Sequence, residues 1–300
     1  MLKFALAIML AVPYGCGPGH DSGPFEDPAP PSPEVFGEGV LSTDAFEWRI
    51  TFTPDGRTAF FGRSEGFFPI TRQATIMTSR YVDGQWTEPE VASFSGEYPD
   101  LDPFVSPDGQ TLYFSSIRPV DGEERTDLDL WLVRRQRDGS WGEPKNMGSR
   151  VNSDSDELYS SVDARGNLYF ASDRAGGLGG WDIYRAQRRH GSYGQVENLG
   201  APVNTAGWEF NPTITPDGRT LLFTGLDRPG GAGIGDIWTT SLKHHRWSEP
   251  VGVGDAVNTA SDEYHPTLSP SLDRLVFIRD GDIYQVSIEA LPPLDLVRHR

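Results

Sequence analysis

One sequence pattern returns five times along the chain, about every fifty residues, and it limits the possible fold more than any other feature. Each copy opens on a glutamate, runs through a short apolar segment to a turn that is Pro-Asp-Gly in three copies, and ends a second apolar segment on an arginine. Proline presets φ, aspartate bonds the following backbone and glycine accepts positive φ, so this tripeptide predicts a tight turn between antiparallel strands. The opening residues are Glu47, Glu97, Glu157, Glu209 and Glu263, and the closing residues are Arg63, Arg118, Arg174, Arg228 and Arg279.

The first four copies each contain four short apolar or alternating runs separated by turn residues, which we interpret as one four-stranded antiparallel blade. The third run begins at Asp-Ile-Tyr or Asp-Ile-Trp in three copies, and the fourth carries Trp-x-Glu-Pro in three copies. The fifth copy lacks a fourth run, whereas residues 33–46 resemble the segment that precedes Glu263. The sequence therefore predicts an all-β, five-bladed β-propeller over residues 35–291 whose last blade is closed by an N-terminal strand, which removes the exposed edge of an open sheet.

The N-terminal segment has the pattern of a bacterial targeting signal. Residues 1–16 resemble a lipoprotein signal, because a basic start and a short apolar run lead to Gly15 and Cys16. Cys16 is the only cysteine, so an intramolecular disulfide is excluded and lipid attachment is expected, with ordinary signal cleavage or a reactive thiol as alternatives. Residues 17–34 are rich in proline and glycine and are expected to form a tether, and residues 292–300 a C-terminal tail.

Charge and composition exclude several classes of partner. The chain has 43 acidic and 26 basic residues, a net charge of -17, which repels phosphate backbones and argues against nucleic acid. Anionic membrane surfaces are disfavoured for the same reason, so membrane association is expected only through a lipid anchor. The six histidines show no metal-binding spacing and one cysteine excludes a cysteine-based zinc site, so no metal or cofactor is expected.

Two short motifs match known sites but lie in the wrong context. Residues 62–66 fit the G-x-S-x-G pattern of serine hydrolases, whose elbow joins a strand to a helix, yet here they end an expected strand. Residues 230–235 (GGAGIG) look like a phosphate loop, but no helix pattern follows them. We predict that neither motif is a functional site.

The repeated glutamates and arginines are expected to meet. Because the first two strands of a blade are antiparallel, the start of one lies beside the end of the other, so five glutamate–arginine pairs are geometrically possible. One interpretation is a structural salt bridge within each blade. The other is a ring of charge at the channel mouth that binds a cation or a polar ligand. Repetition itself argues against catalysis, because an active site needs one asymmetric group of residues.

The order of these motifs resembles the TolB-like propeller repeats, a WD-repeat-like family of bacterial envelope proteins. The likeness rests on Ser/Thr-Pro-Asp-Gly, on Ser-x-Arg at the end of the second strand, on Asp-Ile-Tyr/Trp, and on Leu199-Gly200 followed by Val203-Asn204. It covers residues 35–288. The resemblance implies an envelope protein that faces the periplasm or the exterior.

Only the loops differ between copies, so a binding function is expected there. We predict a non-enzymatic envelope propeller that binds a protein or cell-wall component through the face that carries the strand starts and long loops. The candidate contact residues are Phe67, Phe68, Trp208, His265, Glu97, Asp100 and Asp102.

The alternative is a carbohydrate-active, glycosidase-like enzyme, because five-bladed propellers host glycosidases. Such an enzyme needs two carboxylates about 5–10 Å apart in the central channel. Glu97, Asp100 and Asp102 are the candidates for them.

Overall fold

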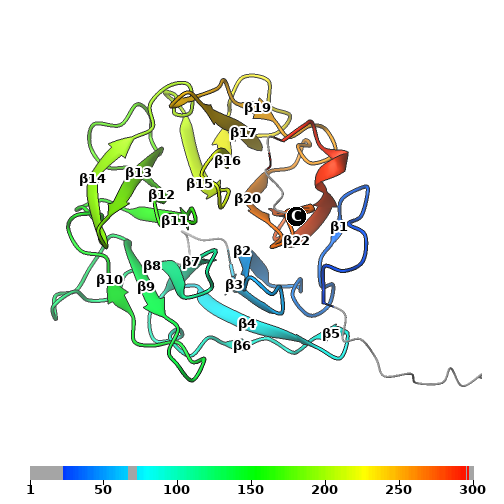
Figure 1. Cartoon of the computed structure of the whole chain (residues 1–300), viewed down its shortest axis with the longest axis horizontal. Coiled ribbons are helices and arrows are strands. Elements are labelled where there is room, and N and C mark those ends of the chain that lie inside the picture. The colour runs from blue at the N-terminus through cyan, green and yellow to red at the C-terminus, as the bar shows by residue number, and fades with distance from the viewer. Residues whose placement is uncertain (1–22, 67–72, 295, 297–300) are drawn as a thin grey trace, which may run out of the picture.

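Five antiparallel sheets surround one axis, as the repeat predicts (Figure 1). The structure is a computed structural model that describes residues 23–66, 73–294 and 296. Blade 1 comprises β2 (Phe46–Phe52), β3 (Thr58–Ser64), β4 (Thr75–Val82), β5 (Gln85–Trp86) and β6 (Glu90–Val91). Blade 2 comprises β7 (Asp100–Val105), β8 (Thr111–Ser116), β9 (Asp129–Arg134) and β10 (Lys145–Asn146). The prediction of an all-β propeller with five blades is confirmed.

The remaining blades repeat this order. Blade 3 comprises β11 (Glu157–Val162), β12 (Leu168–Ser172), β13 (Asp182–Arg189) and β14 (Ser192–Asn198). Blade 4 comprises β15 (Trp208–Ile214), β16 (Thr220–Leu226), β17 (Gly235–Lys243), β18 (Arg246–Trp247) and β19 (Val251–Gly252). Blade 5 comprises β20 (Glu263–Leu268), β21 (Arg274–Arg279), β22 (Asp282–Ser287) and, from the other end of the chain, β1 (Glu34–Val35). A short 3-10 turn, η1 (Ile288–Ala290), follows β22.

The hydrophobic core lies between neighbouring blades rather than within one. Ile50 and Phe61 of blade 1, for example, pack with Val276 and Ile283 of blade 5. Four equivalent clusters join the other adjacent blades around the ring. Each blade therefore needs both neighbours to bury its two faces.

The N-terminal strand closes the ring, as predicted. β1 pairs antiparallel with β22, with Val35 opposite Tyr284, and the backbone N–H of Phe36 donates to the carbonyl of Ile283 at 2.7 Å. The Ser42 hydroxyl accepts the Ile283 N–H at 3.0 Å. Asparagine side chains make the equivalent backbone contact at three other blade junctions, namely Asn152, Asn204 and Asn258.

Part of the expected tether packs on the propeller. The ring of Phe25 contacts those of Phe36 and Phe52, and the Arg274 guanidinium lies 5.1 Å from the Phe25 centroid. The carbonyl of Pro30 accepts the Ser287 N–H at 2.7 Å. The described residues that precede β1 are therefore in contact with blades 1 and 5. The segment is rich in proline, but burial of the Phe25 ring holds it against the propeller.

Two further predictions concern the chain ends. Leu294 and Leu296, in the expected C-terminal tail, pack on the core cluster between blades 4 and 5. Cys16 lies outside the described residues, so its lipidation stays a prediction. Among residues 23–66, 73–294 and 296, no helix is both long enough and apolar enough to cross a membrane.

Candidate functional site

The strand of each blade that lies nearest the axis is its inner strand: β2, β7, β11, β15 and β20. The acidic residue at the start of each inner strand binds an arginine of the same blade, and we call these five pairs the clamps. Four join the predicted partners, and the nitrogen–oxygen distances are 3.1 Å for Glu47–Arg63, 2.8 Å for Glu157–Arg174, 3.4 Å for Glu209–Arg228 and 2.8 Å for Glu263–Arg279. All four carboxylates are fully buried. Each also accepts a hydroxyl and a backbone N–H from the residue four positions earlier, as Glu47 does from Thr43. The geometry favours the structural interpretation of the pairs.

In blade 2 the clamp acid is Asp100, and the prediction of a Glu97–Arg118 pair is wrong. The Arg118 fork binds both oxygens of Asp100, with Nε at 3.0 Å and Nη2 at 2.7 Å, and Ser95 donates to the same carboxylate. Glu97 is exposed and lies before the sheet, since the inner strand of this blade begins at Asp100. Its carboxylate raises the pKa of the neighbouring Tyr98 instead.

Two positions beyond each clamp acid, a different polar side chain stands in each blade. We call these residues the axial set: Arg49, Asp102, Tyr159, Asn211 and His265. A β-bulge interrupts the pairing of all five inner strands at this point. Four of the five have a left-handed backbone, with φ of 56° at Asp102, 60° at Tyr159, 51° at Asn211 and 53° at His265. Bulges turn side chains out of the regular alternation, and contacts within the set join blades on opposite sides of the ring.

His265 is at the centre of these contacts. Its Nδ1 lies 3.1 Å from Asn211 Nδ2 and 3.6 Å from Asp102 Oδ1, and its ring meets that of Tyr159 edge-on at 5.4 Å. Asn211 Oδ1 accepts the backbone N–H of His265, so its Nδ2 must donate to Nδ1 and the imidazole proton is on Nε2. Burial, with a smaller contribution from Arg49, lowers the His265 pKa well below its usual value. The imidazole is therefore neutral at physiological pH.

Arg49 is a buried cation with unused donors. Its Nη2 donates to the Pro212 carbonyl at 3.2 Å and to Thr213 Oγ1 at 3.1 Å, and its guanidinium lies 5.2 Å from the Phe104 centroid. Among the described residues, Nε and Nη1 have no acceptor and no acidic side chain forms an ion pair with Arg49. Burial lowers the pKa of Arg49 to about 10, so the side chain stays charged at neutral pH.

Asp102 is the only carboxylate in the axial set. It is 2% exposed and accepts no hydrogen bond from the described residues, and burial raises its pKa to about 7 while Arg49 opposes that shift. Asp100 is held by Arg118, and Glu97 lies outside the sheet. Glu97, Asp100 and Asp102 therefore do not provide the two facing carboxylates that the glycosidase alternative needs.

Asp102 gives a testable pH dependence. The folded chain keeps its proton up to a pH of about 7, whereas an unfolded aspartate loses it near a pH of about 4. Between these values the folded state holds the additional proton, so the contribution of Asp102 to the free energy of unfolding falls as pH rises, by up to about 1.4 kcal/mol per pH unit. Asp102→Asn is expected to flatten this slope and to be more stable than the parent above about pH 7.

The measurement is urea unfolding at several values from about pH 4 to about pH 8. Arg49 and Tyr159 face Asp102 and do not change charge in that range. His265 also faces Asp102, and because burial lowers its pKa it contributes a slope of the opposite sign below about pH 6.5. The Asp102 contribution is therefore read as the difference between the slopes of the parent and of Asp102→Asn. Glu97→Gln, at an exposed carboxylate, is the matched control and should leave the slope unchanged. A slope in Asp102→Asn equal to that of the parent would contradict the assignment.

The outer candidates lie on the loop face, the side that carries the inner-strand starts and the loops 117–128, 173–181 and 227–234. Trp208, at the start of β15, is 47% exposed and forms a bridge with Trp181 of blade 3. Phe46, Leu178 and Ile234 on the same face are 37%, 53% and 57% exposed. Phe67 and Phe68 lie outside the described residues, so their role stays a prediction.

Asp102 and His265 of the axial set are predicted as candidates by the sequence, whereas Arg49, Tyr159 and Asn211 are not. An alignment on the following proline would have found part of the set, since Asp102, Asn211 and His265 each precede one. Arg49 and Tyr159 lack that signal and need the strand register. No group of three metal-ligating side chains with suitable geometry occurs in the part of the chain that the structure describes.

Solved structures share the fold at low sequence identity. TolB from Acinetobacter baumannii superposes with a TM-score of 0.50 at 19% identity, over 83% of this chain and 56% of that one. A TolB candidate from Agrobacterium tumefaciens gives 0.51 at 21% identity, over 79% and 71%. The fold is similar to that of TolB propellers. The chain spans little more than half the length of the Acinetobacter protein.

The same architecture also occurs in an enzyme. A thermostable family-43 glycoside hydrolase superposes with a TM-score of 0.54 at 9% identity, over 84% of this chain and 91% of that one. No protein-family model matches the sequence, and no curated protein matches it. These likenesses establish the propeller fold, and function has to be argued from the residues.

Proposed function

We propose that the chain is a non-enzymatic propeller of the bacterial cell envelope that binds a protein or a cell-wall component through its loop face. The observation that carries this proposal is the set of apolar side chains exposed there, among them Leu178 on blade 3 and Trp208 and Ile234 on blade 4. Exposed aromatic groups on a rigid scaffold are suited to anchoring a partner. The strands beneath them are tied by the clamps, so the surface is held in one shape.

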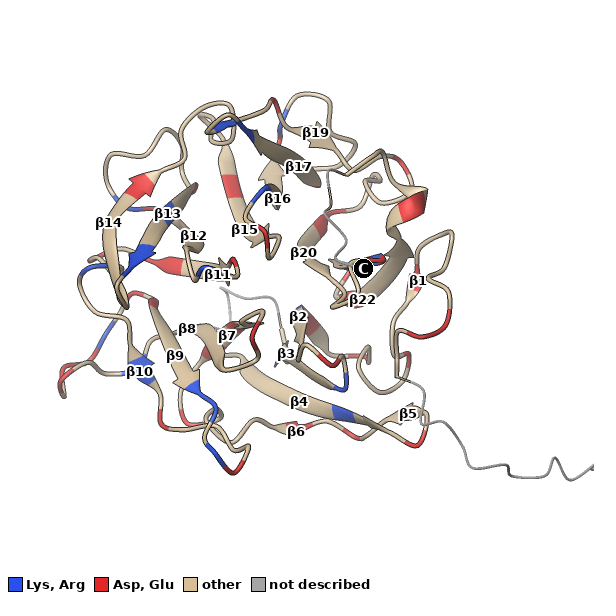
Figure 2. Cartoon of the chain, viewed as in Figure 1, with Lys and Arg blue, Asp and Glu red and all other residues tan. Residues whose placement is uncertain are grey.

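The fold likeness to TolB supports an envelope location, as does the lipoprotein-like start of the sequence. Attachment through a lipid on Cys16 is part of the proposal, and mass analysis of the mature N-terminus tests it. Inner-strand acids are spread around the ring, visible on β11, β15 and β20 (Figure 2). Because all five are clamped by arginines, we assign them to stability rather than to partner binding.

The test is a crosslinking capture from envelope fractions together with co-sedimentation on purified cell walls. Trp208→Ser combined with Ile234→Ser is expected to reduce capture at least about tenfold, because loss of an interface anchor costs roughly 2 kcal/mol or more. Both residues are exposed, so the variant should keep the parent's unfolding midpoint.

The matched control is Val82→Ser combined with Val251→Ser. These side chains are as exposed, at 48% and 53%, but lie on the end of β4 and on the outer strand β19. The control should capture partners as the parent does. Full capture by the loop-face variant, or equal loss in the control, would refute the choice of this face.

A further inference from the structure

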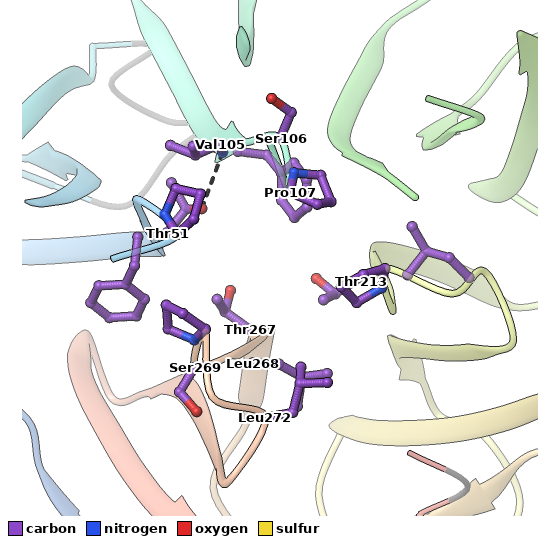
Figure 3. A pocket seen from close by; sticks show the side chains of 15 residues that line it. Thr51, Val105, Ser106, Pro107, Thr213, Thr267, Leu268, Ser269 and Leu272 are labelled. Carbon is purple, nitrogen blue, oxygen red and sulfur yellow. Dashed lines mark hydrogen bonds between the residues drawn. The ribbon is translucent and has the colours of Figure 1, made fainter. Parts of the chain in front are cut away.

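A cavity of about 140 Å³ lies on the axis at the face opposite the loop face, where the turns between the first two strands of blades 1, 2, 4 and 5 meet. Figure 3 shows side chains from four blades around this common space, among them Thr51, Val105, Thr213 and Thr267. The inner strands β2, β7, β15 and β20 supply them. The floor is buried, while Pro54 and Pro270 at the rim are exposed. The cavity is therefore a closed-bottomed socket that opens to solvent.

Threonine hydroxyls make the floor polar. Thr213 Oγ1 donates to the Pro266 carbonyl at 2.6 Å, so its proton is used. Thr51 Oγ1 accepts the Val105 N–H at 3.1 Å, and no acceptor for its own proton is present among the described residues. Thr267 Oγ1 is buried and has no hydrogen-bond partner in the described part of the chain. Thr51 and Thr267 both line the cavity, so two hydroxyl groups at its floor carry a proton that has no acceptor among the described residues.

A positive charge lies directly behind this floor. Arg49 donates to the inner side of Thr213 at 3.1 Å and stacks on Phe104, and both of these residues line the cavity. Asp102 is the described carboxylate whose charge acts on the guanidinium, but it forms no ion pair with Arg49 and burial raises its pKa to about 7. The lining of the cavity contains no acidic side chain. A buried charge without an ion-pair partner is costly, and a bound anion would relieve that cost.

The walls are apolar. Phe104, Val105, Ile214, Leu268 and Leu272 line them, with prolines at the rim. The volume is several times the roughly 30 Å³ that one water occupies, so the socket can hold more than a single ion.

The carboxylates of the neighbouring turns do not face this space. They accept hydrogen bonds within their own turns, as Asp108 does from Ser106 and Asp217 from Thr215, both at 2.6 Å. An anion therefore meets hydroxyl groups and apolar walls in the socket rather than opposing charge.

We propose that this axial socket binds a short-chain aliphatic carboxylate. The carboxylate accepts the hydroxyl protons of Thr51 and Thr267 above the Arg49 charge, and the aliphatic chain lies between the apolar walls. This site is separate from the loop face, so the proposal does not depend on the proposed partner binding.

The experiment titrates the mature chain with sodium butyrate, by calorimetry and by thermal unfolding at constant ionic strength. Butyrate is expected to bind saturably and to raise the unfolding midpoint, since a ligand that binds only the folded state stabilises it. Butyramide has a similar shape without the charge and should do neither. Chloride should not compete, because it has no chain to fill the apolar part.

Thr267→Val tests the floor without disturbing packing, because valine is close in shape and the hydroxyl it replaces has no partner. Butyrate affinity should fall at least about tenfold. Thr224→Val is the matched control: it removes another buried, unpartnered hydroxyl, on β16 away from the cavity, and should bind butyrate as the parent does. Arg49→Met should lose binding.

Four outcomes would overturn the proposal: no saturable butyrate binding, equal effects of butyrate and butyramide, competition by chloride at similar concentration, or unchanged affinity in Thr267→Val. The Thr267→Val result is decisive even where Arg49→Met does not fold.

Discussion

Asp100→Ala is expected to lower the free energy of unfolding by about 3–5 kcal/mol, because it leaves the Arg118 guanidinium buried without its counter-charge. The Asp100 side chain is fully buried and that of Arg118 is 10% exposed, so water cannot replace the two hydrogen bonds between them. Arg118 Nη2 also caps the Phe94 carbonyl, and loss of the carboxylate would loosen that contact. Urea unfolding followed by tryptophan fluorescence measures the change.

Glu97→Ala is the control, since the two acids are three residues apart and only one is a clamp. Its effect should stay within about 0.5 kcal/mol, as for other exposed positions. Equal destabilisation by the two variants would restore the pairing that the repeat alignment indicates and would contradict the register described above.

The second large effect concerns ring closure. A chain that begins at residue 43 lacks β1 together with Phe25, Phe36 and Leu41, which all contact the cluster between blades 5 and 1. It leaves β22 as an open edge with unpaired backbone groups. We expect this chain to be unfolded or aggregated at concentrations where the parent is monodisperse, as measured by circular dichroism and light scattering.

A point variant separates packing from strand pairing. Phe36 is 4% exposed and stacks near Phe25, Phe52 and Trp86, so Phe36→Ala should cost about 3–5 kcal/mol. Phe46→Ala removes a partly exposed ring and should cost less than about 1 kcal/mol. A small effect of Phe36→Ala would mean that the N-terminal segment covers the blade without stabilising it.

The fold could be derived from the sequence because each repeat carries local motifs that mark where its strands and turns begin. The Pro-Asp-Gly turns fixed the first hairpins, and the likeness of residues 33–46 to the segment before Glu263 identified the closing strand. Both are local signals. The packing of Phe25 was not foreseen, because proline and glycine content says nothing about a single aromatic ring that finds an apolar surface elsewhere.

The candidate site was harder to derive because it depends on register. Glu97 and Asp100 are both acidic and close in sequence, and only the strand start decides which one meets Arg118. The five residues of the axial set are all of different types, so the repeats share no residue at this position that the sequence could reveal. Its members become a group only when five bulges bring them to one axis.

The clamps and the axial set stand two residues apart on the same strands, and this separation divides the tasks of the blade. A clamp acid keeps its arginine whether the axial residue at the bulge is arginine, aspartate, tyrosine, asparagine or histidine. The axial residue can therefore be substituted in one blade at a time. The substitution is limited at four positions, because the backbone there is left-handed. The five axial side chains can therefore differ in chemistry while the strands and clamps that hold them stay the same.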